Sequence, residues 1–313
     1  MVKYAVLFPG QGSQAVGMGA ELFDLRPDLL GEAADEVLGW SLREMCLEGP
    51  EDALTRTEHA QPALYAVSFA LWSEAGRHLY GPPAAAAGHS LGEYTALAAA
   101  GVIEYLDGLR LVVARGRAMA EAADREPSGM AALIGADARS AESMASARRA
   151  EGGRLWVANL NAPGQVVLAG GVADIDWAVA NAAEFGLRRV IPLKVAGAFH
   201  SPFMDPAAEA LRAAVAAVAV HDGAFPVWAN ATARPHDDDP GELLVAQLTA
   251  TVRFAESLEA IAASGVTAFL HVGPGDVTAG LAKRSVEGAE AFAVSSLADV
   301  TAAADRLAGP SVS

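Results

Sequence analysis

The segment Gly88-His89-Ser90-Leu91-Gly92 limits the possible folds of this chain more than any other part of its sequence. It lies between a short apolar stretch with the features of a strand and a stretch, 91–100, with helical spacing of its apolar residues. Gly-x-Ser-x-Gly in this setting is typical of a nucleophile elbow, a turn so sharp that side chains at the glycine positions would clash. The pattern predicts Ser90 as a nucleophile at a helix N-terminus, where the backbone N–H of Leu91 can stabilise an oxyanion.

Strands and helices alternate along the rest of the chain, which predicts an α/β fold with a mostly parallel sheet. The first element is a buried strand over 3–8, followed by several helical stretches. Near the C-terminus we expect a strand over 226–230, a helix over 243–264 and a strand over 268–272. The earlier expected helices cover 27–38, 61–76 and 107–123.

A different order of elements occupies residues 128–194 and predicts an inserted subdomain. The pattern there is strand, helix, strand, strand, helix, strand, which is the ferredoxin-like βαββαβ order. We therefore expect a small ferredoxin-like subdomain at 128–194 and a large subdomain formed by 1–127 and 195–313.

A nucleophilic serine needs a general base, and the sequence offers two candidates among its histidines. His200 lies in an irregular stretch of small residues just after the inserted subdomain, at a junction where loops commonly line a cleft. His271 lies near the end of a strand, before a Gly-Pro-Gly turn, and remains an alternative. The other histidines are interpreted as surface residues or, for His89, as pointing away along the turn.

Composition and charge exclude several classes of function. The net charge of −16 opposes binding to nucleic acid. The single cysteine, Cys46, cannot form an internal disulfide or a cysteine cluster, and no His/Asp/Glu grouping has the spacing of metal ligands, so we expect no metal site. The chain has no apolar run long enough to span a membrane, and its first apolar run is too short for a signal peptide. We expect a cytoplasmic protein, and a monomer.

Gly10-x-Gly12 after the first strand imitates a dinucleotide-binding fingerprint. The second strand and the acidic residue that such a site requires are missing, because 24–47 is expected to be helix and loop. We therefore expect no nucleotide cofactor, and no other cofactor.

The chain resembles the malonyl-CoA:acyl carrier protein transacylases, including the stand-alone acyltransferases that serve polyketide synthases. The resemblance runs nearly end to end and covers ordered motifs at family spacing. These are Phe8-Pro-Gly-Gln-Gly-Ser-Gln14, Ala60-Gln-Pro-Ala-Leu64, Gly88-His-Ser-Leu-Gly-Glu-Tyr94, Arg115-Gly116, Asn161-Ala-Pro-Gly-Gln165, Gly197-Ala-Phe-His-Ser201 and Gly273-Pro-Gly275. It implies an α/β-hydrolase-like core with a ferredoxin-like insertion, in agreement with the order of elements above.

The resemblance also implies roles for particular residues. Ser90 is the nucleophile and His200 its general base and acid, in a Ser-His dyad. The backbone N–H groups of Gln11 and Leu91 form the oxyanion hole. Gln247 supplies an oxygen that orients the His200 ring. Arg115 pairs with the free carboxylate of malonate, for which a planar guanidinium is a suitable bidentate partner.

The implied reaction moves a malonyl group from malonyl-CoA, a substrate and not a cofactor, to the thiol of an acyl carrier protein. Leu91 after the serine and Phe199 before His200 resemble the malonyl-selective pattern, since bulky Phe199 would crowd a methyl group at C2. An esterase or acyl-thioester hydrolase on the same elbow remains the alternative, and a non-catalytic docking module is a further one. The sequence leaves open whether the carrier serves fatty-acid or polyketide synthesis.

An acidic carrier and an enzyme of charge −16 repel each other, so docking requires a local basic patch. The candidates for contact with the carrier or coenzyme A are Arg188, Arg189, Lys283 and Arg284. Arg148, Arg149 and Arg154 in the small subdomain are further candidates for the carrier.

Overall fold

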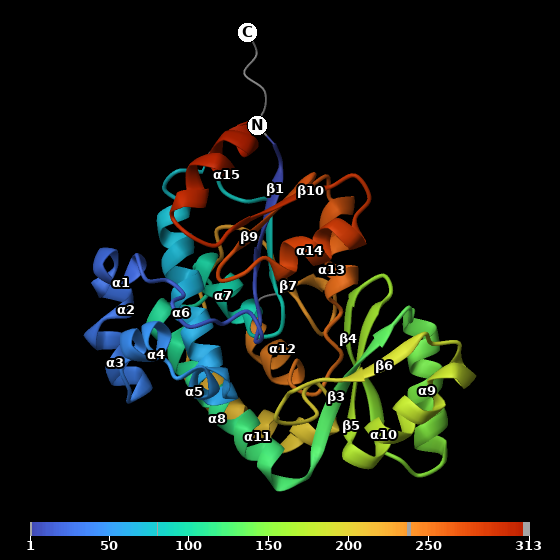
Figure 1. The fold of residues 1–313 in the computed structure, drawn as a ribbon. Helices are drawn as coiled ribbons and strands as arrows, with labels where there is room; N and C mark the ends of the chain where they lie inside the picture. Colours follow the sequence, from blue (N-terminus) through green and yellow to red (C-terminus); the bar gives the residue numbers. More distant parts are fainter. Residues whose placement is uncertain (1, 80, 237–238, 309–313) are drawn as a thin grey trace.

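The computed structural model describes residues 2–79, 81–236 and 239–308 and contains two separate sheets with helices around them (Figure 1). The larger sheet has the order β10-β9-β1-β2-β7-β8, and the smaller one has the order β4-β5-β3-β6. The predicted α/β fold with a parallel sheet is confirmed, because neighbouring strands from β10 to β7 are all parallel.

The strands of the large sheet are short and mostly apolar, as expected for a sheet covered on both faces. Their bounds are β1 (Tyr4–Phe8), β2 (Ala85–Gly88), β7 (Val227–Ala229), β9 (Ala268–Val272) and β10 (Glu290–Val294), with β8 (Arg234–Pro235) antiparallel at the edge. Alternate residues of β1 enter different cores: Val6 and Phe8 pack on one face, and Ala5 and Leu7 on the other.

The core on the Val6 face is the larger one and includes apolar residues of α6 (Thr57–Ala75), α7 (Gly92–Ala99), α8 (Tyr105–Arg125) and α15 (Ala298–Ala308). The core on the Leu7 face includes residues of α13 (Phe254–Ala263) and α14 (Val277–Ser285). The remaining helices of the large part are α1 (Leu22–Leu25), α2 (Pro27–Leu30), α3 (Glu32–Leu38), α4 (Leu42–Leu47), α5 (Glu51–Thr55), η2 (Pro202–Met204), α11 (Asp205–Val215) and α12 (Pro240–Ala246).

The small sheet is antiparallel throughout and has its own apolar core. The elements of this part of the chain, in order, are β3 (Ser128–Ile134), α9 (Ala138–Ala150), β4 (Leu155–Ala162), β5 (Gln165–Gly171), α10 (Val172–Asn181), η1 (Ala182–Phe185) and β6 (Arg189–Pro192). The predicted βαββαβ order of elements is therefore present, and it forms the green and yellow lobe at the lower right of Figure 1.

Two predicted helices are wrong in extent. The helix expected over 27–38 is interrupted at Gly31, where a Cβ would lie 2.4 Å from the carbonyl oxygen of Pro27. The helix expected over 243–264 is interrupted after α12, because Val252 is extended and exchanges backbone hydrogen bonds with β4 residues Ala158 and Leu160. Apolar periodicity alone did not reveal these tertiary contacts.

No helix among the described residues combines the length and the apolar character that crossing a bilayer requires.

Candidate active site

The turn between β2 and α7 has the geometry of the predicted elbow. A Cβ on Gly88 would lie 1.8 Å from the carbonyl carbon of Gly92, and one on Gly92 would lie 2.4 Å from the carbonyl oxygen of Phe8. Both positions therefore require glycine. Between them Ser90 adopts a φ of 52°, a left-handed conformation that is rare for a side-chain-bearing residue. The elbow thus holds the serine hydroxyl at the carboxyl end of the parallel sheet.

His200 is the histidine that contacts this hydroxyl. Its Nε2 lies 2.8 Å from Ser90 Oγ, and its Nδ1 lies 2.8 Å from the backbone oxygen of Gln247. The carbonyl accepts the Nδ1 proton, so Nε2 is left as the acceptor for the serine proton. Burial of the ring, together with the nearby charge of Arg115, lowers the pKa of His200 to about 3. The ring is therefore neutral and able to accept a proton at neutral pH.

Arg115 is fully buried on α8 beside the same hydroxyl. Its Nη2 donates to Ser90 Oγ at 3.0 Å and to the side-chain oxygen of Gln247 at 2.9 Å, while Nη1 donates to that of Gln61 at 2.7 Å. Its guanidinium carbon also lies 5.4 Å from the centroid of the Tyr94 ring. All of these partners are uncharged, and Nε has no acceptor within the described residues. Burial lowers the pKa of Arg115, but an arginine stays cationic in a protein.

A cavity of about 180 Å³ opens beside the two reactive side chains. Its walls come from both sheets: Gln11, Ser90 and His200 lie on one side, and Asn159 and Val167 on the other. Its remaining lining residues are Gln61, His89, Met119, Met130, Asn161, Leu193, Val195 and Phe199. The lining thus combines polar side chains, including those of Ser90 and His200, with apolar side chains such as that of Phe199.

Two backbone N–H groups near the cavity are available as donors. Among the described residues, neither the N–H of Gln11 nor that of Leu91 has a hydrogen-bond acceptor. Leu91 directly follows the serine and precedes α7, so the partial positive charge of the helix N-terminus adds to its N–H. These groups suit an oxyanion formed on a carbonyl carbon attacked by Ser90.

The alternative base, His271, is occupied elsewhere. Its Nδ1 lies 2.6 Å from Thr278 Oγ1 on α14 and its Nε2 lies 3.1 Å from the backbone oxygen of Gly273, so both ring nitrogens are bonded to residues that closely follow His271 in the chain. His89 bonds to Asn161 Oδ1 at 2.7 Å and does not compete for Ser90. Of the two candidates left open by the sequence, the structure brings His200 to the serine.

A family model described as "Acyl transferase domain" matches residues 6–301. The chain belongs to the acyl transferase domain family. It is 41% identical over 302 residues to "Malonyl CoA-acyl carrier protein transacylase" of Bacillus subtilis (strain 168), an alignment that covers 94% of each protein.

Solved structures of this acyl transferase family match over nearly the whole chain. The malonyl-CoA:acyl carrier protein transacylase from Xanthomonas oryzae pv. oryzae KACC10331 aligns with a TM-score of 0.91 at 40% identity, covering 98% of this chain and 99% of that one. A malonyl-transacylase solved in complex with a type II PKS acyl-carrier protein also has a TM-score of 0.91, at 36% identity and covering 97% and 99%. This chain therefore shares the acyl transferase fold along its full described length.

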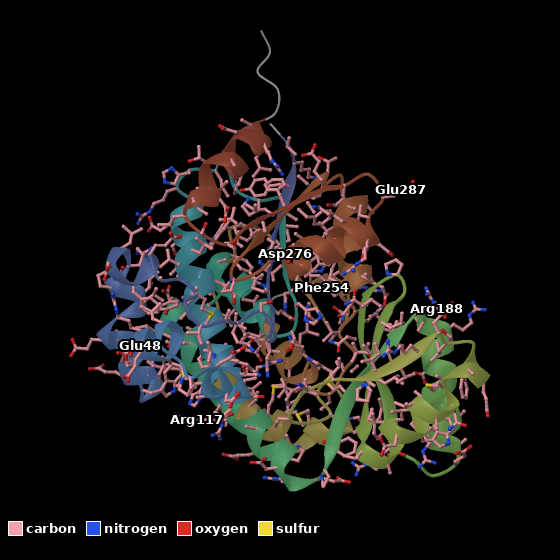
Figure 2. The ribbon with its side chains drawn as sticks, in the orientation of Figure 1. Glu48, Arg117, Arg188, Phe254, Asp276 and Glu287 are labelled. Carbon is pink, nitrogen blue, oxygen red and sulfur yellow. The ribbon has the colours of Figure 1, made fainter. Side chains whose placement is uncertain are left out.

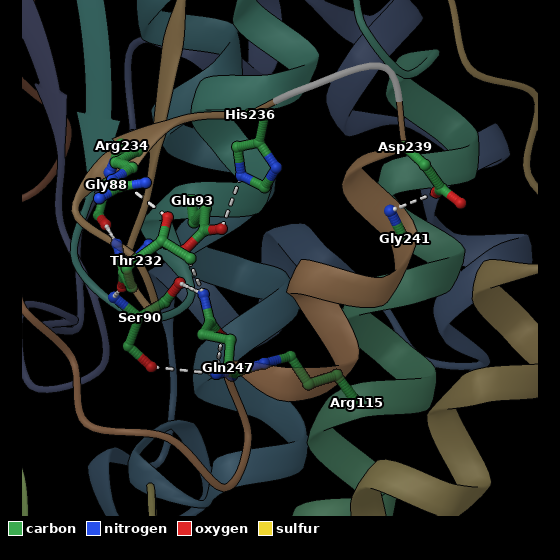
Figure 3. Close-up of polar contacts among 11 residues, drawn as sticks. Gly88, Ser90, Glu93, Arg115, Thr232, Arg234, His236, Asp239, Gly241 and Gln247 are labelled. Carbon is green, nitrogen blue, oxygen red and sulfur yellow. Dashed lines mark hydrogen bonds and ion pairs between the residues drawn. The ribbon is translucent and has the colours of Figure 1, made fainter.

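Sequence reasoning missed a second group of buried polar contacts beside the acyl transferase elbow (Figure 3). These are Glu93, Asn230 and His236, together with the side chain of Gln247. Glu93 stands in the quoted motif, but its neighbours are more than 130 residues away in sequence. The surface position predicted for His236 is wrong, because its side chain is only 5% exposed and its Nε2 bonds to Glu93.

The candidate docking residues fall into three groups. Arg188 and Arg189 are exposed, and Figure 2 shows Arg188 at the outer rim of the small lobe. Neither forms an ion pair within the described residues. Arg148, Arg149 and Arg154 are instead bound to carboxylates of Asp174, Glu142 and Glu126, respectively. Arg188 and Arg189 are thus available to a binding partner, whereas the second group is already paired with carboxylates of the chain itself.

Lys283 and Arg284 form the third group and lie in the last turn of α14. The helix begins after Asp276, at the carboxyl end of β9, and runs back along the parallel sheet. The two cations therefore lie at the end of the helix farther from the edge where Ser90 lies, so their place in the basic patch that docking requires stays a prediction.

Proposed function

We propose that this chain transfers a malonyl group from malonyl-CoA to the phosphopantetheine thiol of an acyl carrier protein, through an ester on Ser90. One observation carries the proposal: a buried guanidinium, which has no carboxylate partner within the described residues, lies 3.0 Å from a serine oxygen that is itself 2.8 Å from a histidine nitrogen. A nucleophile and a binding group for an acyl carboxylate are thereby combined in one cavity. The named relatives catalyse this class of reaction.

In the first half-reaction, Ser90 Oγ attacks the thioester carbonyl and its proton passes to His200 Nε2. The oxyanion lies between the N–H groups of Gln11 and Leu91. When the tetrahedral intermediate collapses, the C–S bond breaks and His200 returns the proton to the coenzyme A thiolate. In the second half-reaction, the carrier thiol attacks the ester, His200 takes the thiol proton, and that proton is returned to Ser90 Oγ as the ester bond breaks.

Arg115 selects the acyl group in this proposal. A malonyl carboxylate entering the cavity would lose its hydration, which costs several kcal/mol unless a buried cation receives it. Phe199 lines the same cavity and limits the room for a substituent at C2. Because one methyl group is worth only about 1–3 kcal/mol, we expect selectivity for malonyl over methylmalonyl to be incomplete.

We also propose subdomain boundaries, a cellular location and an oligomeric state for the protein. We assign residues 1–127 and 195–313 to an α/β-hydrolase-like large subdomain and 128–194 to a ferredoxin-like one. The order of elements in the small sheet and its neighbours β4-β5-β3-β6 support the second assignment. We also propose a cytoplasmic monomer that needs no cofactor for the transfer.

The test is to incubate the protein with malonyl-CoA and measure its intact mass, then add an acyl carrier protein. We expect a malonyl ester on Ser90, ping-pong kinetics, and passage of the label to the carrier thiol. Ser90→Ala is expected to abolish labelling. An alanine variant that still gained the malonyl mass would refute the role of Ser90.

The same experiment separates a transferase from a thioester hydrolase. In a transferase the malonyl-enzyme persists in water for minutes and is discharged when the carrier is added. Rapid release of free malonate without a carrier would favour the hydrolase.

A further inference from the structure

Glu93 is a fully buried carboxylate that the proposed mechanism does not use. It lies in the first turn of α7, and its only ion-pair partner within the described residues is His236. Its Oε2 accepts from the backbone N–H of Asn230 at 2.9 Å and from Gln247 Nε2 at 2.7 Å, while His236 Nε2 lies 2.7 Å from its Oε1. A carboxylate without exposure needs several such donors, because each lost donor would leave a charged acceptor without hydration.

One of these contacts leads to the nucleophile. Asn230 accepts the Ser90 N–H with Oδ1 at 2.7 Å and donates from Nδ2 to the carbonyl oxygen of Gly88 at 2.7 Å. The Asn230 side chain therefore binds the elbow on both sides of His89. Glu93 accepts the backbone N–H of Asn230 and so fixes the position of the Asn230 side chain.

A second contact of Glu93, with Gln247, leads to Arg115 (Figure 3) and also to the base. Gln247 Nε2 bonds both to Glu93 and to the carbonyl oxygen of Ser90 at 3.0 Å, and its Oε1 receives Arg115 Nη2. The backbone oxygen of the same residue holds His200 Nδ1. The Gln247 amide thus lies between Arg115 and Glu93 and bonds to both, and among the described residues the Arg115 guanidinium is left without a carboxylate partner.

We infer that Glu93, held by His236, is a positioning residue that aligns Ser90 and His200 by binding Asn230 and Gln247 at once. The inference rests on the proposed serine–histidine chemistry, but it does not depend on malonate or on a carrier. Small misalignments of reacting groups can reduce rates by about 100-fold, so loss of one carboxylate contact is expected to be visible in the reactivity of the serine.

The test measures the rate at which Ser90 is modified by an uncharged fluorophosphonate, which needs the serine and its base alone. In Glu93→Gln, an NH2 group replaces one of the two carboxylate oxygens and must face a hydrogen-bond donor instead of an acceptor. We expect the rate of Ser90 modification to fall by about 30- to 100-fold. His236→Ala removes one donor and is expected to slow modification by about tenfold. His236→Gln keeps an N–H donor within reach of Glu93 and is expected to stay within about threefold of the parent rate.

Glu74→Gln is the matched control for loss of a buried carboxylate. Glu74 is 7% exposed and binds Arg26 and Arg77 at the end of α6, away from the cavity. We expect it to lower the melting temperature without slowing modification of Ser90. If Glu93→Gln does not fold, the comparison of His236→Ala with His236→Gln tests the inference instead.

The inference is overturned if Glu93→Gln reacts at nearly the parent rate, if His236→Gln is as slow as His236→Ala, or if Glu74→Gln is slowed as much as Glu93→Gln. If the parent protein reacts with the fluorophosphonate but never accepts malonate, the proposed function fails and this inference stands.

Discussion

Ser90 and His200 both have positive φ angles, 52° and 56°, although neither is glycine. Such a conformation costs on the order of 1–3 kcal/mol and persists only where surrounding contacts enforce it. For Ser90 these contacts are two hydrogen bonds. Its N–H donates to Asn230 Oδ1, and its carbonyl oxygen accepts from Gln247 Nε2. The reactive oxygen and nitrogen are therefore placed by tertiary contacts at two strained residues.

The pKa of His200 leads to a prediction for pH dependence. Burial and the charge of Arg115 favour the neutral ring and lower the pKa to about 3, so the base form is lost only as pH falls towards that value. We expect the rate of Ser90 modification by an uncharged fluorophosphonate to show no loss attributable to His200 between about pH 5 and 8.

Arg115→Ala provides the control for the cause of this shift. Because the variant removes the repelling charge, the pKa of His200 should rise, and the loss of rate on the acidic side should move to higher pH. A parent profile that falls with a midpoint near 6.5, the ordinary value for histidine, would contradict the assignment.

At the scale of elements, the break after α12 places Gln247 for its role. Gln247 is the C-cap residue of α12, and its carbonyl oxygen accepts a hydrogen bond from Nδ1 of His200. In a continuous helix that oxygen would instead bond to a backbone N–H four residues later. The helix predicted over 243–264 would therefore have removed the contact that orients the base.

The tight packing of α7 against β1 gives a stability prediction. Gly92→Ala would place a methyl group 2.4 Å from the backbone oxygen of Phe8, so we expect a loss of about 2 kcal/mol in the free energy of unfolding. Gly280→Ala is the matched control, because nothing lies within 4 Å of its Cβ position in α14. It is expected to be neutral or to stabilise by up to about 1 kcal/mol. Denaturant unfolding measures the free energy of unfolding of each variant. Equal changes in the two variants would contradict the packing of Gly92 against Phe8.

Much of this architecture could be predicted because it depends on local patterns. Apolar strands and the Gly-x-Ser-x-Gly turn revealed the parallel sheet and the position of Ser90. The contacts among Glu93, Asn230 and His236 could not be predicted, because each joins residues far apart in sequence whose types are common on surfaces. The ion pairs of Arg148 with Asp174 and of Arg154 with Glu126 were hidden for the same reason.

At the scale of the whole molecule, the cavity depends on how the two sheets meet. His89 in the elbow bonds to Asn161 on β4, and Val252 between α12 and α13 pairs with the same strand. The small sheet thereby supplies one wall of the cavity beside a serine carried by the large sheet. An acyl group reaching Ser90 must fit between both.

The unpaired cations at one edge of the small sheet predict where a carrier docks. We expect charge reversal at Arg188 and Arg189 to slow transfer to an acidic carrier while labelling of Ser90 by malonyl-CoA stays nearly unchanged. The defect should shrink as salt is added, since exposed charges act mainly on the association rate. Reversal at Lys283 and Arg284, at the far end of α14, is the control and should have a smaller effect. Unchanged carrier transfer at low salt in the Arg188 and Arg189 variant, or an equal defect in the control, would exclude this docking surface.

The most direct test of the account compares malonyl-CoA with acetyl-CoA as donors to Ser90 in Arg115→Ala, with intact mass as the readout. We expect malonylation to slow by about 100-fold, because the buried carboxylate loses its partner, while acetylation falls far less or rises. Arg117→Ala, an exposed position on the same helix (Figure 2), should change neither rate. Equal losses for both acyl groups would show that Arg115 supports the structure and does not select the substrate.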